Sequence, residues 1–192
     1  MRNILFMGCL TGVFLILAGC SSRSVSDSYM REEVDLGYVE KIAVLPFQNN
    51  SSDEYAPKLA RDITITQVLA MGLFDVVDKD LVDNMLYDEA IGAGEPLAPL
   101  SMKRIGRRLN VQALLVGTVD MAGTVKLGST TSPEVALTLR LIETDSGMIL
   151  WQASGHYSGE SFGRRLLGIK PDNTYKINSD LIRKLLNTAP LP

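Results

Sequence analysis

Cysteine and histidine are nearly absent from this sequence, which restricts the chemistry that the protein can perform. The 192 residues contain two cysteines, Cys9 and Cys20, and one histidine, His156. Zinc sites take three or four cysteine, histidine or carboxylate ligands, so we expect no metal centre. Ser158, two residues after His156, does not have the spacing of a nucleophile elbow. We therefore expect no catalytic residue, and a hydrolase that uses His156 is the least supported alternative.

A surplus of positive charge is also missing. Lysine and arginine total 19 against 22 aspartates and glutamates, and loss of Arg2 with the N-terminal segment would leave 18 against 22. Proteins that bind nucleic acid usually carry a basic surplus, so we expect no nucleic-acid partner. A glycine-rich phosphate loop is missing as well, because Gly92 and Gly94 follow a predicted helix and Leu97 replaces the third glycine. We expect no cofactor.

The N-terminus has the pattern of a secretory signal. Arg2 is followed by an apolar run from Ile4 to Ala18, which is shorter than the ~20 apolar residues of a membrane-spanning helix. The run ends in the sequence LAGC at residues 17–20. An aliphatic residue, two small residues and a cysteine in this order resemble the lipobox of bacterial lipoproteins.

The lipobox resemblance implies that residues 1–19 are a signal peptide, cleaved before Cys20. It also implies that Cys20 carries acyl chains such as palmitate on its sulfur and on its new amino group. Ser21 rather than aspartate follows, which by the rules of this family directs the lipoprotein to the outer membrane, on its periplasmic face. The alternative is an ordinary signal peptide with an incidental cysteine. If Cys9 leaves with the signal and Cys20 is lipidated, no thiol pair is left for a disulfide.

The rest of the chain divides into a linker and one domain. Residues 20–38 are rich in serine and poor in apolar side chains, which predicts a flexible, lipidated tether. Residues 39–192 are long enough to form a single periplasmic domain with its own core.

Hydrophobic patterns in residues 39–192 predict an α/β fold: a single mixed β-sheet flanked by helices, with a C-terminal antiparallel hairpin. The apolar run in KIAVLPFQN, from Lys41, is typical of a strand buried on both faces. The segment EVALTLRLIE, from Glu134, alternates apolar and polar residues, and the turn at 144–147 pairs it with MILWQASGHY. Further strands are expected in LFDVVDKD and VQALLVGTV, and helices at 55–72, after Asp78, after Ser101 and at 174–187.

Capping and periodicity predict details of the first two helices. Ser51 and Glu54 have the spacing of a capping box before the first helix. The expected buried face of that helix consists of Leu59, Ile63, Thr66, Ala70 and Leu73. Asp78 is expected to be the N-cap of the second helix, since its side chain can accept a hydrogen bond from a free backbone N–H.

Basic residues gather on the predicted third helix. They are Lys103, Arg104, Arg107 and Arg108, and a second pair follows at Arg164 and Arg165. A solvated helix face near a helix C-terminus explains such a cluster. The alternative is a contact surface for an acidic envelope protein, a lipid headgroup or an anionic polymer. We keep the four residues of the helix, called the basic cluster below, as candidate partner-binding residues.

The order of three motifs resembles the CsgG-type family of bacterial lipoproteins, whose relatives share the N-terminal domain fold of TolB. The motifs are IAVLPFQNNSSD, LFDVVDKDLVDNML, and the segment from Val111 that contains TDSGMILW. The resemblance covers residues 39–158. It implies a CsgG/TolB-N-like fold and no catalytic residue, because none is known for the family.

Pore-forming members of this family insert two amphipathic hairpins, and each strand of a membrane barrel needs ~9–11 alternating residues. Residues 120–134 allow only a short turn-back, and residues 158–174 show no alternation, so both insertions are expected to be missing. The resemblance then implies a periplasmic binding protein: an accessory or assembly component of an envelope export or secretion system, or alternatively an activator of a peptidoglycan synthase. We expect a homo-oligomer that associates through helix faces and through an exposed sheet edge of EVALTLRLIE or MILWQASGHY.

Overall fold

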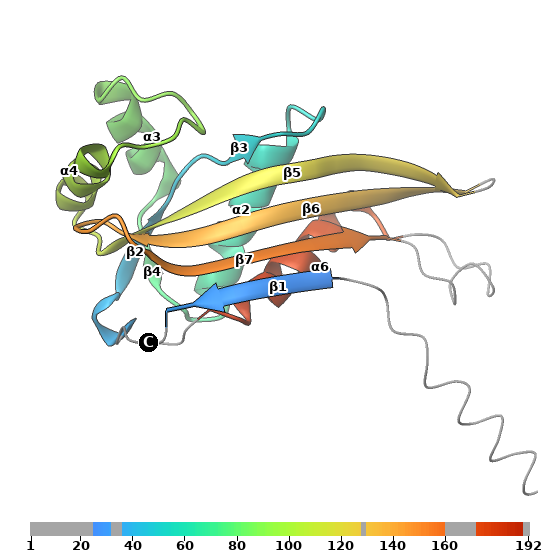
Figure 1. Cartoon of the computed structure of the whole chain (residues 1–192). Helices are drawn as coiled ribbons and strands as arrows, with labels where there is room; N and C mark the ends of the chain where they lie inside the picture. Colours follow the sequence, from blue (N-terminus) through green and yellow to red (C-terminus); the bar gives the residue numbers. More distant parts are fainter. Residues whose placement is uncertain (1–24, 32–35, 128–129, 160–171, 190–192) are drawn as a thin grey trace, which may run out of the picture.

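The computed structural model describes residues 25–31, 36–127, 130–159 and 172–189 (Figure 1). Cys20 and the pair Arg164 and Arg165 lie outside these ranges. In chain order the elements are β1 (Val25–Met30), the 3-10 turn η2 (Leu36–Tyr38), β2 (Lys41–Val44), β3 (Gln48–Asn49), α2 (Ala56–Ala70), β4 (Asp75–Val76), α3 (Lys79–Asp88), α4 (Pro99–Leu109), β5 (Ala113–Leu127), β6 (Thr130–Glu143), β7 (Ile149–Ser158) and α6 (Thr174–Leu186).

One mixed sheet organises the fold, and its seven strands follow the order β1-β7-β6-β5-β2-β4, with β3 paired to β5. β2 is parallel to both β4 and β5. β5, β6, β7 and β1 are antiparallel to one another in turn. The predicted α/β class and C-terminal antiparallel hairpin are confirmed.

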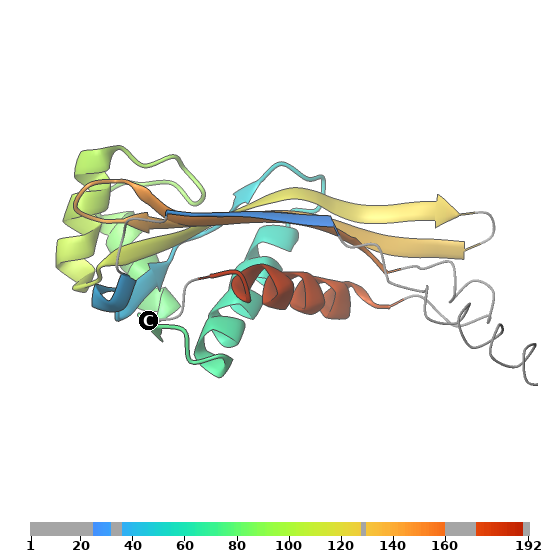
Figure 2. The ribbon, with the colours of Figure 1, turned by 60° about the horizontal axis from the view of Figure 1, so that its bottom comes forward.

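Helices cover the two faces of the sheet unequally. α2 and α6 lie together on one face (Figure 2) and form the larger core with side chains such as Val44 and Leu115. α3 and α4 form a smaller core with Ala43 and Leu114 on the opposite face. Neighbouring residues of β2 and β5 serve different cores because successive strand residues point to opposite faces.

The alternation in β6 produces the larger core as expected. Four apolar side chains on one face are at most 1% exposed, namely those of Val135, Leu137, Leu139 and Leu141. The intervening residues face the opposite side, where Thr138 and Ser154 place their hydroxyl oxygens 3.0 Å apart. Around these two residues the open face of β6 and β7 is thus polar, whereas the face that α2 and α6 cover is apolar.

The predicted flexible tether is wrong for part of residues 20–38. Val25–Met30 forms β1 and pairs along β7 from His156 to Trp151. Further on, Leu36 and Val39 are buried, and the Tyr38 hydroxyl donates a hydrogen bond to Glu143. Burial, this hydrogen bond and the charge of Glu143 raise the pKa of Tyr38 to about 12. The sequence did not predict this strand, because serine alternates with Val25, Asp27 and Tyr29 and the segment looks like a polar linker. The strand forms because its backbone N–H and C=O groups hydrogen-bond to β7, which does not depend on the side chains.

The expected exposed edges of the C-terminal strands are also wrong. β6 lies between β5 and β7, and β7 is covered by β1. The edge of the sheet is therefore β1 on one side and the two-residue β4 on the other. The prediction failed because it assigned β1 to the tether and so left β7 without its neighbour.

β5 and β6 continue beyond β7 as a projecting hairpin (Figure 1). β7 ends at Ser158, opposite Glu134, whereas β5 and β6 pair onward to Leu127 and Thr130. Most of the stretch expected as a short turn-back is thus regular strand. No helix in the described ranges is both long and apolar enough to span a membrane.

Of two local predictions for α2, the capping box is wrong, whereas the buried face is confirmed for Ile63 and Leu73 and wrong for Thr66 and Ala70. The helix begins after Tyr55, which provides no side-chain cap, and Ser51 instead hydrogen-bonds within its own turn to Asn49. Thr66 and Ala70 are exposed, while the buried face includes Ala60, Ile63, Thr64, Gln67 and Val68. The buried face is rotated because α2 packs on α6 as well as on the sheet, so Gln67 donates a hydrogen bond to Ser179. The predicted N-cap of α3 is confirmed, since Asp78 accepts from the Asp80 N–H at 2.9 Å.

Candidate functional site

The basic cluster lies on α4 and is largely paired with acidic residues of the same chain. Three of its four members form ion pairs. These join Lys103 to Asp145 (3.1 Å), Arg104 to Glu89 (2.7 Å), and Arg108 to Glu89 (2.8 Å) and Asp88 (3.4 Å). The hydrogen bond that Arg108 donates to Glu89 is the main cause that raises the pKa of Arg108 above its usual value. The three residues therefore connect α4 to the end of α3 and to the turn before β7.

Arg107 differs from the rest of the basic cluster. It is exposed, and within the described ranges it is the one member of the four that forms no ion pair. Close packing fixes α4 at this position, since a Cβ on Gly106 would lie 2.5 Å from the Thr144 side chain. The helix thus presents Arg107 to solvent from a rigid support.

His156 lies on the open face of β7, where its Nε2 is 3.5 Å from a carboxylate oxygen of Glu134. Its side chain is 43% exposed. In the part of the chain that the structure describes, no serine, threonine or cysteine side chain hydrogen-bonds to it. The described residues also include no group of three or more potential metal ligands. The geometry around His156 therefore offers a contact with one carboxylate rather than an activated nucleophile.

A buried arginine that the sequence analysis did not single out links α2, β2 and α3. Arg61 is 6% exposed. Its Nε and Nη2 donate to the backbone carbonyl of Val44 at 3.1 and 2.9 Å, and its Nη1 donates to Asp83 at 2.9 Å. A groove of about 830 Å³ opens beside it between α2 and α3, with Tyr87, 85% exposed, on its wall. Because its partners are a strand carbonyl and a carboxylate on another helix, only the tertiary structure reveals its role.

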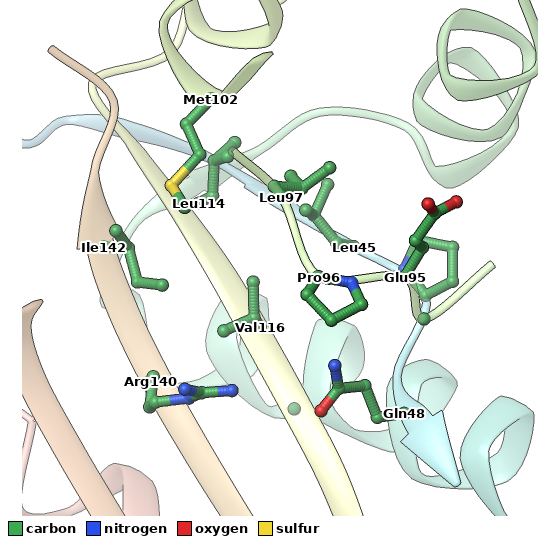
Figure 3. Close-up of a pocket in the computed structure, with 13 residues that line it drawn as sticks. Leu45, Gln48, Glu95, Pro96, Leu97, Met102, Leu114, Val116, Arg140 and Ile142 are labelled. Carbon is green, nitrogen blue, oxygen red and sulfur yellow. The ribbon is translucent and has the colours of Figure 1, made fainter. Parts of the chain in front are cut away.

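A smaller pocket of about 160 Å³ lies on the open face of the sheet, beneath the loop that precedes α4 (Figure 3). Apolar side chains line most of it, among them Leu45, Pro96, Leu97, Met102, Leu114, Val116 and Ile142. The polar side chains of the lining are Arg140 from β6 and Gln48 from β3, which carry hydrogen-bond donors, and Glu95 from the loop. This arrangement of an apolar body with few polar groups is typical of a small binding site.

Comparison with known proteins identifies the fold. No protein-family model and no curated protein matches the sequence. The PelC dodecamer from Paraburkholderia phytofirmans matches with 21% identity and a TM-score of 0.59, over 85% of this chain and 95% of that chain. Lipoprotein GNA1162 from Neisseria meningitidis matches with 18% identity and a TM-score of 0.58, over 77% and 96%. The NMR structure of E. coli LpoB matches with 12% identity and a TM-score of 0.50, over 64% and 59%.

These identities are low, so the likeness shows a shared fold and no shared residue roles. Nearly the whole length of PelC and of GNA1162 is covered. The chain therefore has the α/β fold of a protein that forms a dodecamer and of a protein that is a lipoprotein.

Proposed function

We propose that the protein is a lipoprotein anchored to the outer membrane through Cys20, and that its periplasmic domain acts by binding, as a self-associating component of an envelope export or secretion system. The observation that carries this proposal is the fold, which spans 95% of the PelC chain and is found there in a dodecamer. The lipobox at residues 17–20 supplies the anchor. GNA1162, a lipoprotein, supports the combination of this fold with an anchor.

Self-association has a suitable surface in β1. This edge strand exposes Tyr29 and Met30, at 53% and 49%, and its one charged residue is Asp27. Edge strands present unpaired backbone N–H and C=O groups, and proteins that avoid pairing usually protect them with several charges or a proline. β1 lacks that protection, so we propose that it pairs with another copy of the chain.

The outer edge of β5 provides the complementary surface. On this side β5 pairs with β2 at residues 113–115 and with β3 at residues 118–119. In the described ranges the next residues, Met121 to Leu127, pair only with β6. This seven-residue edge matches the six residues of β1 in length, and exposed Lys126 is opposite in charge to Asp27. Contact between two different surfaces is head-to-tail, and such contacts close into a ring when their rotation permits.

Replacing Ser28 with lysine is expected to disrupt the assembly without unfolding the domain. Ser28 is exposed on β1, so the single chain tolerates the longer side chain. In the assembly the added charge would lie in a strand-pairing interface, where its partial desolvation costs free energy. A cost of ~1.4 kcal/mol or more lowers the affinity of each contact by about tenfold or more. Sedimentation of the detergent-solubilised lipoprotein measures the loss of mass.

The matched control is Ser52→Lys, which adds the same charge at an exposed loop position. We expect its assembly to keep the mass of the unmodified protein. If Ser28→Lys and Ser52→Lys assemble equally well, β1 is not the interface.

Only one residue of the basic cluster is available to bind a partner in this proposal. Lys103, Arg104 and Arg108 are engaged within the chain, so the predicted contact with an acidic envelope protein or an anionic polymer falls mainly on Arg107. One exposed arginine binds weakly, but a ring repeats it in every copy, and repetition multiplies weak contacts. The alternative role, activation of a peptidoglycan synthase, stays a prediction from the sequence resemblance.

A further inference from the structure

The pocket beneath the loop before α4 has the size of a site for one ring or one branched side chain. Its volume of about 160 Å³ is close to that of an engineered cavity of ~150 Å³ that binds benzene. The floor is the open face of β5 and β6, and the roof is the loop that carries Glu95 and Pro96 (Figure 3). The lining also contains polar side chains, those of Arg140, Gln48 and Glu95. These side chains determine what the pocket could bind.

Arg140 lies on the floor of the pocket without a partner. It occupies the open face of β6, opposite Val116 of β5 and Gln152 of β7. Its Nε is buried and makes no hydrogen bond. No ion pair or hydrogen bond joins its guanidinium to any other described residue. A buried donor left without an acceptor costs free energy, so an acceptor supplied from outside would be bound favourably.

Gln48 adds a second donor on the same side of the pocket. Its Oε1 accepts a hydrogen bond from the Thr118 hydroxyl at 3.2 Å, which leaves the N–H groups of its amide for another acceptor. Figure 3 shows the Arg140 guanidinium and the Gln48 amide pointing toward one another from opposite sides of β5. Two donor groups therefore converge beside an apolar space.

Glu95, the acidic residue of the lining, does not neutralise Arg140. One of its carboxylate oxygens accepts from the Gly92 N–H at 2.9 Å, which holds the side chain to its own loop. Its carboxylate points away from Arg140 in Figure 3. The positive charge at the floor of the pocket therefore remains uncompensated by the groups around it.

We infer that this pocket is a binding site for a carboxylate attached to a compact apolar body of about the size of a benzene ring. The carboxylate accepts hydrogen bonds from the Arg140 guanidinium, whose paired N–H groups match a carboxylate in geometry, and from the Gln48 amide. The apolar body fills the space among Leu97, Met102 and Val116. A phosphate fits less well, because its higher charge and three oxygens need more donors than the two that line this pocket. The inference is independent of the proposed ring.

The experiment uses benzoate as the probe and the full lipoprotein in detergent as the receptor. Saturation-transfer NMR of the ligand measures its binding, and the variant Arg140→Met in the same detergent accounts for partition into micelles. We expect saturable binding of benzoate that is about 10- to 100-fold weaker in Arg140→Met, the loss typical of a hydrogen bond to a charged group. Benzamide, which has the same shape without the charge, should lose a similar factor, and acetate, which lacks the ring, should not saturate.

A second variant tests the site without removing Arg140. Val116→Phe extends a side chain from β5 into the pocket and should abolish benzoate binding, so the test remains valid if Arg140→Met fails to fold. N-acetyl-leucine and its amide test whether the carboxylate is the C-terminus of a peptide. Tighter binding of N-acetyl-leucine than of its amide and of benzoate would indicate the end of a peptide chain. Equal binding of benzoate and benzamide, or equal binding to the protein and to both variants, would overturn the inference.

Discussion

Replacing Cys20 with alanine is expected to leave the chain as an uncleaved precursor that carries no palmitate. The lipobox resemblance at residues 17–20 motivates this result. Each buried CH₂ of an acyl chain contributes ~0.8 kcal/mol to membrane binding, and stable anchoring takes more than one chain. Loss of the acceptor cysteine therefore removes every acyl chain, while the uncleaved precursor keeps its apolar N-terminal run. Metabolic labelling with palmitate, combined with fractionation of the envelope, measures both effects.

Cys9→Ala is the matched control, because Cys9 lies inside the same apolar run but upstream of the cleavage point. We expect this variant to be cleaved and labelled as the unmodified chain is. Palmitate labelling of Cys20→Ala, together with its recovery in the outer membrane, would show that the lipobox assignment is wrong.

Replacing Gly117 with alanine is expected to destabilise the domain by about 1–3 kcal/mol, the usual cost of overpacking a core. A Cβ on Gly117 would lie 2.5 Å from the ring of Phe47, which is buried against the larger core. The ring must move, and with it the segment between β2 and β3 that lines both the groove and the pocket. Chemical denaturation of the variant measures the change in free energy of unfolding.

Gly123→Ala is the matched control on the same strand, since a Cβ there meets no atom within 4 Å. We expect its stability to change by less than about 0.5 kcal/mol or to rise slightly, because alanine lowers the entropy of the unfolded chain. Combining Gly117→Ala with Phe47→Leu should cost less than the sum of the two changes, since the smaller side chain relieves the contact. Equal effects of the two glycine substitutions would mean that the ring of Phe47 does not constrain β5.

The fold class could be predicted from the sequence because, in a long helix or strand, the buried positions repeat at the period of that element and are occupied by apolar residues. The alternation from Val135 to Leu141 follows directly from one buried and one open face, and the structure confirms it. The apolar run from Ile42 to Leu45 predicted a strand buried on both faces, and helices from both sides do cover it. These signals are local, so they can be recognised without knowledge of the tertiary structure.

Features that depend on long-range contacts were not predicted. β1 is a strand because β7 offers it a partner more than a hundred residues away, and its short mixture of serine, aspartate and apolar residues is too weak a pattern to predict a strand. The phase of α2 is set by α6 as well as by the sheet. The ion pairs of the basic cluster join residues of α3, α4 and the turn before β7. Arg140 appeared only as a polar residue in an alternating strand, and its unpartnered Nε is visible only in the folded chain.

We propose above that the protein works as a lipid-anchored homo-oligomer built on this fold. The mass of the full lipoprotein, extracted from membranes in mild detergent and measured by native mass spectrometry, tests it most directly. We expect one discrete assembly whose mass is a whole multiple of the mass of the lipidated chain, and subunit masses that include the acyl chains on Cys20. A lipidated monomer at every concentration accessible to the measurement would contradict the claim.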